Sequence, residues 1–157
     1  MKIILTGGGS GGHITPLLAV ARELRKIDAG VEIIAVCEKD AKFLHLFQDD
    51  KFIDSVHQIA AGKYRRYAGL SRLKRLTDVS TLALNVRDAG RLCRGYTQAR
   101  RLLKRIKPDM ILIKGGFVGV PVGLAAAHLN IPFITHDSDS TPGMANRIIS
   151  RISRLIR

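Results

Sequence analysis

The sequence is poor in cysteine and in acidic residues, and it contains no long uninterrupted apolar run. Its 157 residues include two cysteines, Cys37 and Cys93, and 13 Asp or Glu residues stand against 26 Lys or Arg residues. No apolar stretch approaches the roughly 18 residues that a transmembrane helix needs, and the N-terminus has no signal-peptide pattern. Two cysteines in this setting are typical of buried, reduced thiols. These absences predict a cytoplasmic protein without a membrane span.

The sequence also lacks internal repeats, low-complexity tracts and any His/Cys cluster or carboxylate spacing typical of a metal site. We therefore expect neither a metal nor a cofactor. With 46% hydrophobic residues the chain can bury one sizeable core. The length and composition together predict one domain over residues 1–157.

Short apolar runs alternate with amphipathic stretches along the chain. Each apolar run is nearly continuous, which is typical of strands buried on both faces of a parallel sheet. The pattern predicts an α/β fold, a Rossmann-like doubly wound parallel sheet with helices on both faces. The strands are expected at 2–6, 31–36, 52–59, 110–113 and 131–135. The helices are expected at 14–27, 41–47, 71–107 with a break near Gly90 or Gly95, after the turn at 115–119 up to 128, and at 142–157.

A glycine-rich run, Gly7-Gly8-Gly9-Ser10-Gly11-Gly12-His13, joins the first expected strand to the first helix. Glycines remove side chains and permit positive φ, so backbone N–H groups and the first helical turn can enclose a phosphate or diphosphate. A second glycine turn, Gly115–Gly119, follows the strand at 110–113. Right-handed crossovers would bring both turns to the same edge of the sheet.

One hypothesis for the first turn is a dinucleotide site. Gly7, Gly9 and Gly12 satisfy the pattern G-x-G-x-x-G, and Glu38 could hold a ribose, which would indicate an NAD- or FAD-binding Rossmann domain of an oxidoreductase. Such a site requires neither His13 after the glycines nor a second glycine turn. It also gives no role to the polar run at 136–140, His-Asp-Ser-Asp-Ser.

Four segments resemble the MurG family of glycosyltransferases: Gly8–Pro16, Gly115–Pro121, Ile131–Asp137 and Pro142–Arg147. The resemblance covers essentially the whole chain and implies the N-terminal half of a GT-B fold. It implies an inverting hexosyltransferase that moves GlcNAc from UDP-GlcNAc to undecaprenyl-pyrophosphoryl-MurNAc-peptide (lipid I), giving lipid II for peptidoglycan. The UDP-GlcNAc-binding C-terminal domain would be absent from these residues or lie on a separate donor chain, so we expect the isolated chain to be inactive. A related alternative is the acceptor half of a split GT-B enzyme, such as the one that makes dolichol-linked chitobiose.

The resemblance also implies roles for individual residues. His13 or Asp137 would be the general base on the acceptor hydroxyl, and the amide of Asn146 would bind the acceptor sugar or phosphate. Asp137 stands where the family usually has glutamate, Asp139 where it often has asparagine, and Phe117 where tyrosine is common. If the two aspartates lie close together, repulsion would raise the pKa of one of them enough to make it the base. The residues expected to bind the acceptor are Gly8, Gly9, Ser10, Gly11, Gly12, Gly115, Gly116, Phe117, Gly119, Asp139 and Asn146.

Positive charge is concentrated between residues 61 and 107, which hold 14 Lys or Arg residues against Asp78 and Asp88. At one end of this segment, tyrosines and leucines alternate with cations, which favours an anionic membrane surface over nucleic acid because no nucleic-acid motif accompanies the charge. The resemblance likewise implies peripheral docking on the inner face of the cell membrane. The residues expected at the membrane are Tyr64, Arg65, Arg66, Tyr67, Leu70, Arg72, Leu73, Lys74, Arg75 and Leu76. A solvated helix face is expected for Arg87, Arg91, Arg94 and Arg101.

Overall fold

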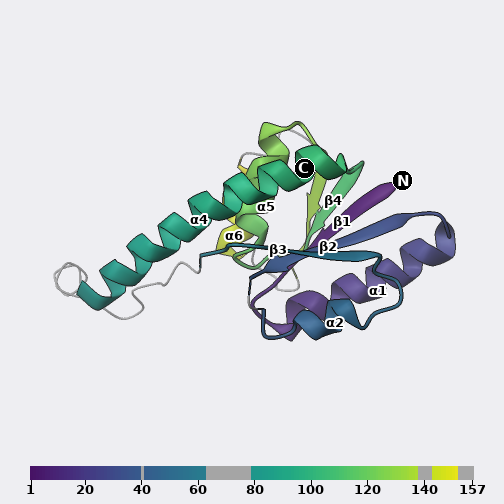
Figure 1. The fold of residues 1–157 in the computed structure, drawn as a ribbon, viewed down its shortest axis with the longest axis horizontal. Helices are drawn as coiled ribbons and strands as arrows, with labels where there is room; N and C mark the ends of the chain where they lie inside the picture. The colour runs from purple at the N-terminus through teal and green to yellow at the C-terminus, as the bar shows by residue number, and fades with distance from the viewer. Residues whose placement is uncertain (40, 63–78, 138–142, 152–157) are drawn as a thin grey trace.

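Five parallel strands form one sheet in the order β3-β2-β1-β4-β5 (Figure 1). The computed structural model describes residues 1–39, 41–62, 79–137 and 143–151, without the side chains of 79–83 and 85. The strands are β1 (Lys2–Thr6), β2 (Glu32–Glu38), β3 (Ser55–Ile59), β4 (Met110–Ile113) and β5 (Phe133–Thr135). The strand order reverses beside β1, as in doubly wound folds, and the predicted fold class is confirmed.

The helices cover both faces of the sheet (Figure 1). On one face lie α1 and α2, and on the other lie α4, α5 and α6. Their bounds are α1 (Gly11–Ile27), α2 (Leu44–Gln48), α4 (Val79–Ile106), α5 (Gly119–His128) and α6 (Met144–Ser150).

β1 shows why the strands read as continuous apolar runs. Ile3 and Leu5 pack into the cluster beneath α1, whereas Ile4 belongs to the cluster under α4 and α5. All three side chains are at most 4% exposed. A strand buried on both faces cannot alternate apolar with polar residues, which is the pattern that predicted this sheet.

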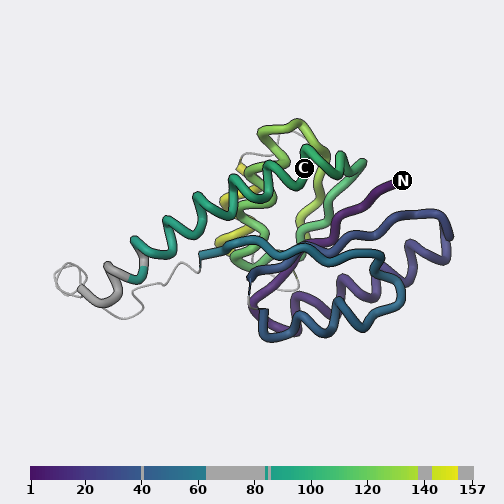
Figure 2. The backbone as a smooth tube through the Cα atoms, in the orientation of Figure 1, coloured from purple at the N-terminus to yellow at the C-terminus, as the bar shows by residue number. Residues whose placement is uncertain are grey.

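α4 is one unbroken helix of 28 residues, about 42 Å long. The break expected near Gly90 or Gly95 does not occur. Gly95 instead permits close packing, because a Cβ atom there would collide with the carbonyl oxygen of Ala60. Gly62 lies equally close to the backbone of Asp88. The chain that leaves β3 thus crosses directly over α4, and Figure 2 shows α4 running on beyond the sheet at its N-terminal end.

Several expected boundaries shift by a few residues. α1 begins at Gly11, three residues earlier than predicted, and β2 extends to Glu38. Of the helix predicted at 142–157, the described residues contain α6, and residues 152–157 lie outside them. No helix in the described part of the chain has the combined length and apolarity required to cross a membrane.

Candidate functional site

The loops that follow β1 and β4 meet at the point where the strand order reverses. Gly9, Gly115 and Gly116 have φ values of +86°, +92° and +79°, a left-handed region that favours glycine. The two loops touch: a Cβ atom at Gly116 would lie 2.6 Å from the carbonyl oxygen of Gly8. Ligands of open parallel sheets bind at this kind of crevice.

The last glycines of the first run belong to a helix and not to a loop. Gly11 and Gly12 begin α1, and His13 completes its first turn, with its N–H donating to the carbonyl oxygen of Ser10 at 3.1 Å. Ser10 is the N-cap residue, but its side chain makes no capping hydrogen bond, and the first turn contains no acidic residue. The positive end of the α1 dipole is therefore not neutralised by a side chain of its own first turn.

The first glycine loop already holds an anion of the protein itself. The Gly9 N–H donates to Oε1 of Glu38 at 2.8 Å. A Cβ atom at Gly8 would collide with the other oxygen of this carboxylate, Oε2. Oε2 is buried and has no hydrogen-bond partner among the described residues. Glu38 is thus turned into the first glycine loop.

Beside the second loop lies a cavity of about 570 Å³. Its wall brings together six of the residues predicted for the site, contributed by α1, the second glycine loop, the chain after β5 and α6. They are His13, Gly115, Gly116, Phe117, Asp137 and Asn146.

The other predicted residues are placed elsewhere. Five residues of the first glycine run do not line this cavity: Gly8, Gly9, Ser10, Gly11 and Gly12. Gly119 starts α5 and packs against β4, where a Cβ atom would lie 2.6 Å from Ile113 Cγ2. The prediction for Asp139, and that for the membrane-facing residues of 64–76, lie outside the described residues.

Asp137 and Asn146 form a polar pair in the cavity wall. Nδ2 of Asn146 donates to Oδ2 of Asp137 at 2.8 Å and to the carbonyl oxygen of His136 at 3.3 Å, and the Gly143 N–H donates to the same carboxylate oxygen at 3.3 Å. The Asn146 side chain is 3% exposed, and its Oδ1 has no partner among the described residues. Oδ1 lies beside Gly115, at 3.9 Å from an ideal Cβ position there. The pair therefore ties the start of α6 to the chain after β5, beside the second loop, and leaves one buried acceptor without a partner among the described residues.

Sequence reasoning missed the apolar half of this cavity. Leu92 of α4, Val120 of α5, and Met144 and Ile148 of α6 line it together with the polar residues. Their helical spacing indicates an apolar face but does not distinguish a face packed into the core from one that borders a cleft. Lys114, 3% exposed, was also missed: it directly precedes the second loop and is buried.

Two side chains, on β2 and β3, have shifted pKa values. Burial, and secondarily the negative charge of Glu38, raises the pKa of the Cys37 thiol to about 12. Burial, and secondarily Arg105, lowers the pKa of His57. Cys37 is therefore protonated at neutral pH and is not a nucleophile. Among the described residues, no group of three His, Cys, Asp or Glu side chains could hold a metal ion.

Comparison with known proteins identifies relatives of this arrangement. Residues 3–156 match the glycosyltransferase family 28 N-terminal domain. A protein of Lachnospira eligens is 41% identical over 150 residues, covering 96% of this chain and 38% of the relative. A protein of Shouchella clausii is 41% identical over 152 residues, covering 97% and 38%. Both relatives are named UDP-N-acetylglucosamine–N-acetylmuramyl-(pentapeptide) pyrophosphoryl-undecaprenol N-acetylglucosamine transferase.

Solved structures share the fold. The crystal structure of Acinetobacter baumannii MurG superimposes with a TM-score of 0.74 at 24% identity, over 98% of this chain and 39% of that one. UDP-GlcNAc 2-epimerase from Methanocaldococcus jannaschii gives a TM-score of 0.58 at 17% identity, over 98% and 38%. The chain spans less than two fifths of the length of the curated relatives it matches.

Proposed function

We propose that this chain, which belongs to the glycosyltransferase family 28 N-terminal domain family, is the acceptor-binding part of a hexosyltransferase of the MurG type. The reaction would transfer GlcNAc from UDP-GlcNAc to undecaprenyl-pyrophosphoryl-MurNAc-peptide, with lipid II as the product. The names of the two relatives support this acceptor and donor. The observation that carries the proposal is the cavity in which His13, Asp137 and Asn146 face the second glycine loop.

The two halves of the cavity match the two kinds of surface on such an acceptor. Gly115 and Gly116 offer backbone groups without side chains in the way, and we assign the diphosphate to them. The unpartnered Oδ1 of Asn146 would accept a hydrogen bond from a hydroxyl or amide N–H of the sugar. The apolar wall, with Val120 and Met144, would pack against the carbon skeleton of the acceptor.

His13 is the better placed of the two predicted bases. Its ring lines the cavity and has no hydrogen-bond partner among the described residues, whereas Asp137 is committed to Asn146 and Gly143. The acceptor hydroxyl oxygen would form a bond to the anomeric carbon of the donor while the bond from that carbon to the UDP oxygen breaks. The hydroxyl proton would pass to His13, and the configuration at the anomeric carbon would invert. Asp137 would act as a positioning residue that holds Asn146.

The nucleotide sugar would be bound outside these 157 residues, by a C-terminal domain or by a separate donor chain. The share of the relatives that this chain covers, 38%, leaves room for such a domain. We also propose that the segment with Tyr64, Arg65 and Tyr67 docks on the anionic inner face of the cell membrane, at about 1 kcal/mol for each cation near the surface. The purified chain should then bind acceptor and membrane without transferring sugar.

Sedimentation with vesicles tests the acceptor assignment. The chain is mixed with phosphatidylcholine vesicles that do or do not contain a lipid I analogue, and with anionic vesicles lacking it. We expect analogue-dependent binding that weakens in His13→Ala and Asn146→Leu. His45→Ala is the matched control, because His45 is exposed on α2 and does not line the cavity.

A second arm tests the chemistry in the longer enzyme that includes the donor-binding half. His13→Ala should lower kcat by about 10²- to 10⁴-fold, the usual contribution of a general base. Equal loss of acceptor binding in His13→Ala and His45→Ala, or full kcat without the His13 imidazole, would remove the assignment. Saturable binding of NAD or FAD to the chain would favour the oxidoreductase hypothesis instead.

A further inference from the structure

A second cavity, of about 370 Å³, lies at the outer edge of the sheet between β3 and α4. Its wall consists of His57, Gln58 and Ile59 from β3 and of residues 98–105 of α4, and it shares no residue with the cavity beside the second glycine loop. Neither the sequence motifs nor the proposed function gives this cavity a role.

Beside the apolar Ile59 and Leu102, the side chains at this cavity are polar or cationic. Arg101 and Arg105 are exposed, one helical turn apart on α4, and both line the cavity. No carboxylate lines it. Within the described residues neither arginine has an ion-pair partner, although Arg87 and Arg91 of the same helix share Asp88 at 3.4 and 3.7 Å. Arg101 is exposed, as predicted, and the structure adds that it borders a concave site together with Arg105.

Gln98 adds a donor whose orientation is fixed. Its Oε1 accepts the Ala60 N–H at 2.7 Å, so the NH₂ end of the same amide must point the other way. Gln98 lines the cavity, and no partner of its NH₂ group is present in the described part of the chain. Two guanidinium groups and a fixed amide donor thus surround one space.

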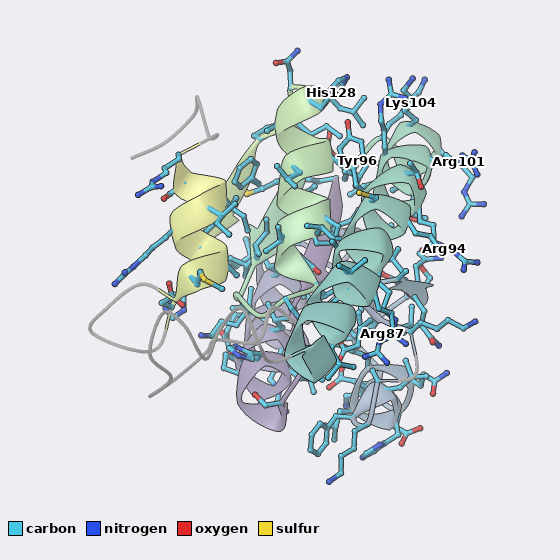
Figure 3. The ribbon with its side chains drawn as sticks, turned by 90° about the vertical axis from the view of Figure 1, so that its left-hand side faces the viewer. Arg87, Arg94, Tyr96, Arg101, Lys104 and His128 are labelled. Atoms are coloured by element: carbon cyan, nitrogen blue, oxygen red, sulfur yellow. The ribbon has the colours of Figure 1, made fainter. Side chains whose placement is uncertain are left out.

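The His57 ring lies in the same cavity wall as Arg105. It is half-buried on β3, and its pKa is lowered by burial and secondarily by Arg105. An anion bound between the arginines would offset the charge of Arg105 and raise the pKa of His57. Figure 3 shows the side chains of Arg87, Arg94 and Arg101 on the same outer side of α4, away from α5. The cavity lies at the end of this row that Arg101 forms, beside β3.

We propose that Arg101, Arg105, Gln98 and His57 form a binding site for a phosphate monoester, separate from the acceptor cavity. Guanidinium groups match phosphate oxygens in paired hydrogen bonds, and the amide of Gln98 would donate to a third oxygen. The phosphate group belongs to a small soluble molecule or to a lipid headgroup. The proposal does not depend on the proposed function of the acceptor cavity.

Titration of the purified chain with inorganic phosphate tests the site by NMR, with the imidazole signals of His57 identified by His57→Gln. We expect a saturable shift of the His57 signals and a rise in the His57 pKa. Arg101→Gln/Arg105→Gln should weaken phosphate binding at least about tenfold. Arg94→Gln removes one positive charge from the same helix outside the cavity, and it should change binding less than about twofold. It is also the matched control for each single variant, Arg101→Gln and Arg105→Gln.

Vesicles distinguish the two sources of the phosphate group. Phosphatidylcholine vesicles with and without phosphatidic acid are compared for the wild type and the same variants. Binding that depends on phosphatidic acid and on Arg101 and Arg105 indicates a lipid headgroup, and saturable binding of free phosphate alone indicates a soluble ligand. Equal losses in Arg94→Gln and in the double variant, or a shift that chloride at the same ionic strength reproduces, would overturn the proposal. Thermal unfolding of each variant verifies that the fold is retained.

Discussion

The two glycine loops look alike in sequence but perform different tasks in the structure. Both follow an apolar strand, and both contain glycines with positive φ. The loop after β1 is filled by Glu38, whose carboxylate accepts the Gly9 N–H. The loop after β4 borders the cavity with Gly115 and Gly116. The first loop is therefore occupied by a side chain of the protein itself, and the second forms part of a cavity wall.

The difference shows what a glycine-rich motif can and cannot predict. Glycines mark places where the chain turns with positive φ or approaches another group closely. Whether that group is a ligand or the protein itself depends on residues far away in the sequence, here Glu38, which lies 29 positions after Gly9. Of the first run, His13, in the first turn of α1, lines the cavity, whereas the glycines before it do not.

Gly116→Ala should produce the largest effect, because it damages both loops together. An alanine at φ +79° is strained, and its Cβ would lie 2.6 Å from the Gly8 carbonyl oxygen. We expect the free energy of unfolding to fall by about 3 kcal/mol, from strain and overpacking combined. Chemical denaturation monitored by circular dichroism measures this.

The matched control for that variant is Gly11→Ala. An added Cβ at Gly11 meets nothing within 4 Å, and the residue starts α1. Its stability should be unchanged or higher by up to about 1 kcal/mol. If both alanines destabilise the chain equally, contact between the loops is not what requires glycine at 116.

The second prediction concerns Glu38 and tests whether its carboxylate, which fills the first loop, stabilises the fold. Glu38→Ala removes the acceptor of the Gly9 N–H and should lower the free energy of unfolding by about 1–2 kcal/mol. Glu38→Gln keeps an oxygen at the same place and should lose less than half of that. Equal denaturation midpoints for the three proteins would mean that the first loop does not need its internal carboxylate.

The sequence predicted the strands well because their signal is local. β1 and β4 fall on the predicted residues, since a strand buried on both faces must be apolar at nearly every position. The α4 helix was harder: Gly95 reads as a helix breaker, but its place is set by contact with Ala60, 35 positions earlier. A glycine can therefore lie inside a helix, despite its low helix propensity, where close tertiary packing leaves no room for a side chain.

The site was predicted in part for the same reason. The motifs predicted residues that do line one cavity, namely His13, Gly115, Asp137 and Asn146. The apolar wall, of which Leu92 of α4 is an example, carries no motif. Its role depends on which helix face remains uncovered, and that is decided by packing between α4, α5 and α6.

Asp137→Asn tests how the start of α6 is held against the chain after β5, beside the second loop, with a smaller expected effect on stability. The amide would keep one acceptor oxygen but lose the charge-assisted bonds from Asn146 and Gly143. We expect a loss of about 1 kcal/mol in the free energy of unfolding. Asp49→Asn, at an exposed position after α2, should cost less than half of this. Identical losses in the two variants would show that the Asp137 contacts do not stabilise the site.

The smallest effect is expected at Cys37, which lies beside Glu38 on β2. Replacing Cys37 by alanine should leave function at neutral pH unchanged, and the labelling rate of its thiol reports whether the first loop opens. Its thiol is fully buried, whereas Cys93 on α4 is exposed. With a pKa of about 12, Cys37 should react with a thiol reagent at least about a hundredfold more slowly than Cys93 at neutral pH. The unfolded thiol ionises near 9.0, so the stability contributed by the protonated thiol is complete below pH 9.0 and is lost as pH rises toward about 12. In denaturation experiments, the free energy of unfolding of Cys37→Ala should fall less steeply over that pH range.

Faster labelling of Cys37 in Glu38→Ala than in Glu38→Gln would locate the opening at the first loop. Equal labelling rates would mean that the carboxylate does not close this loop.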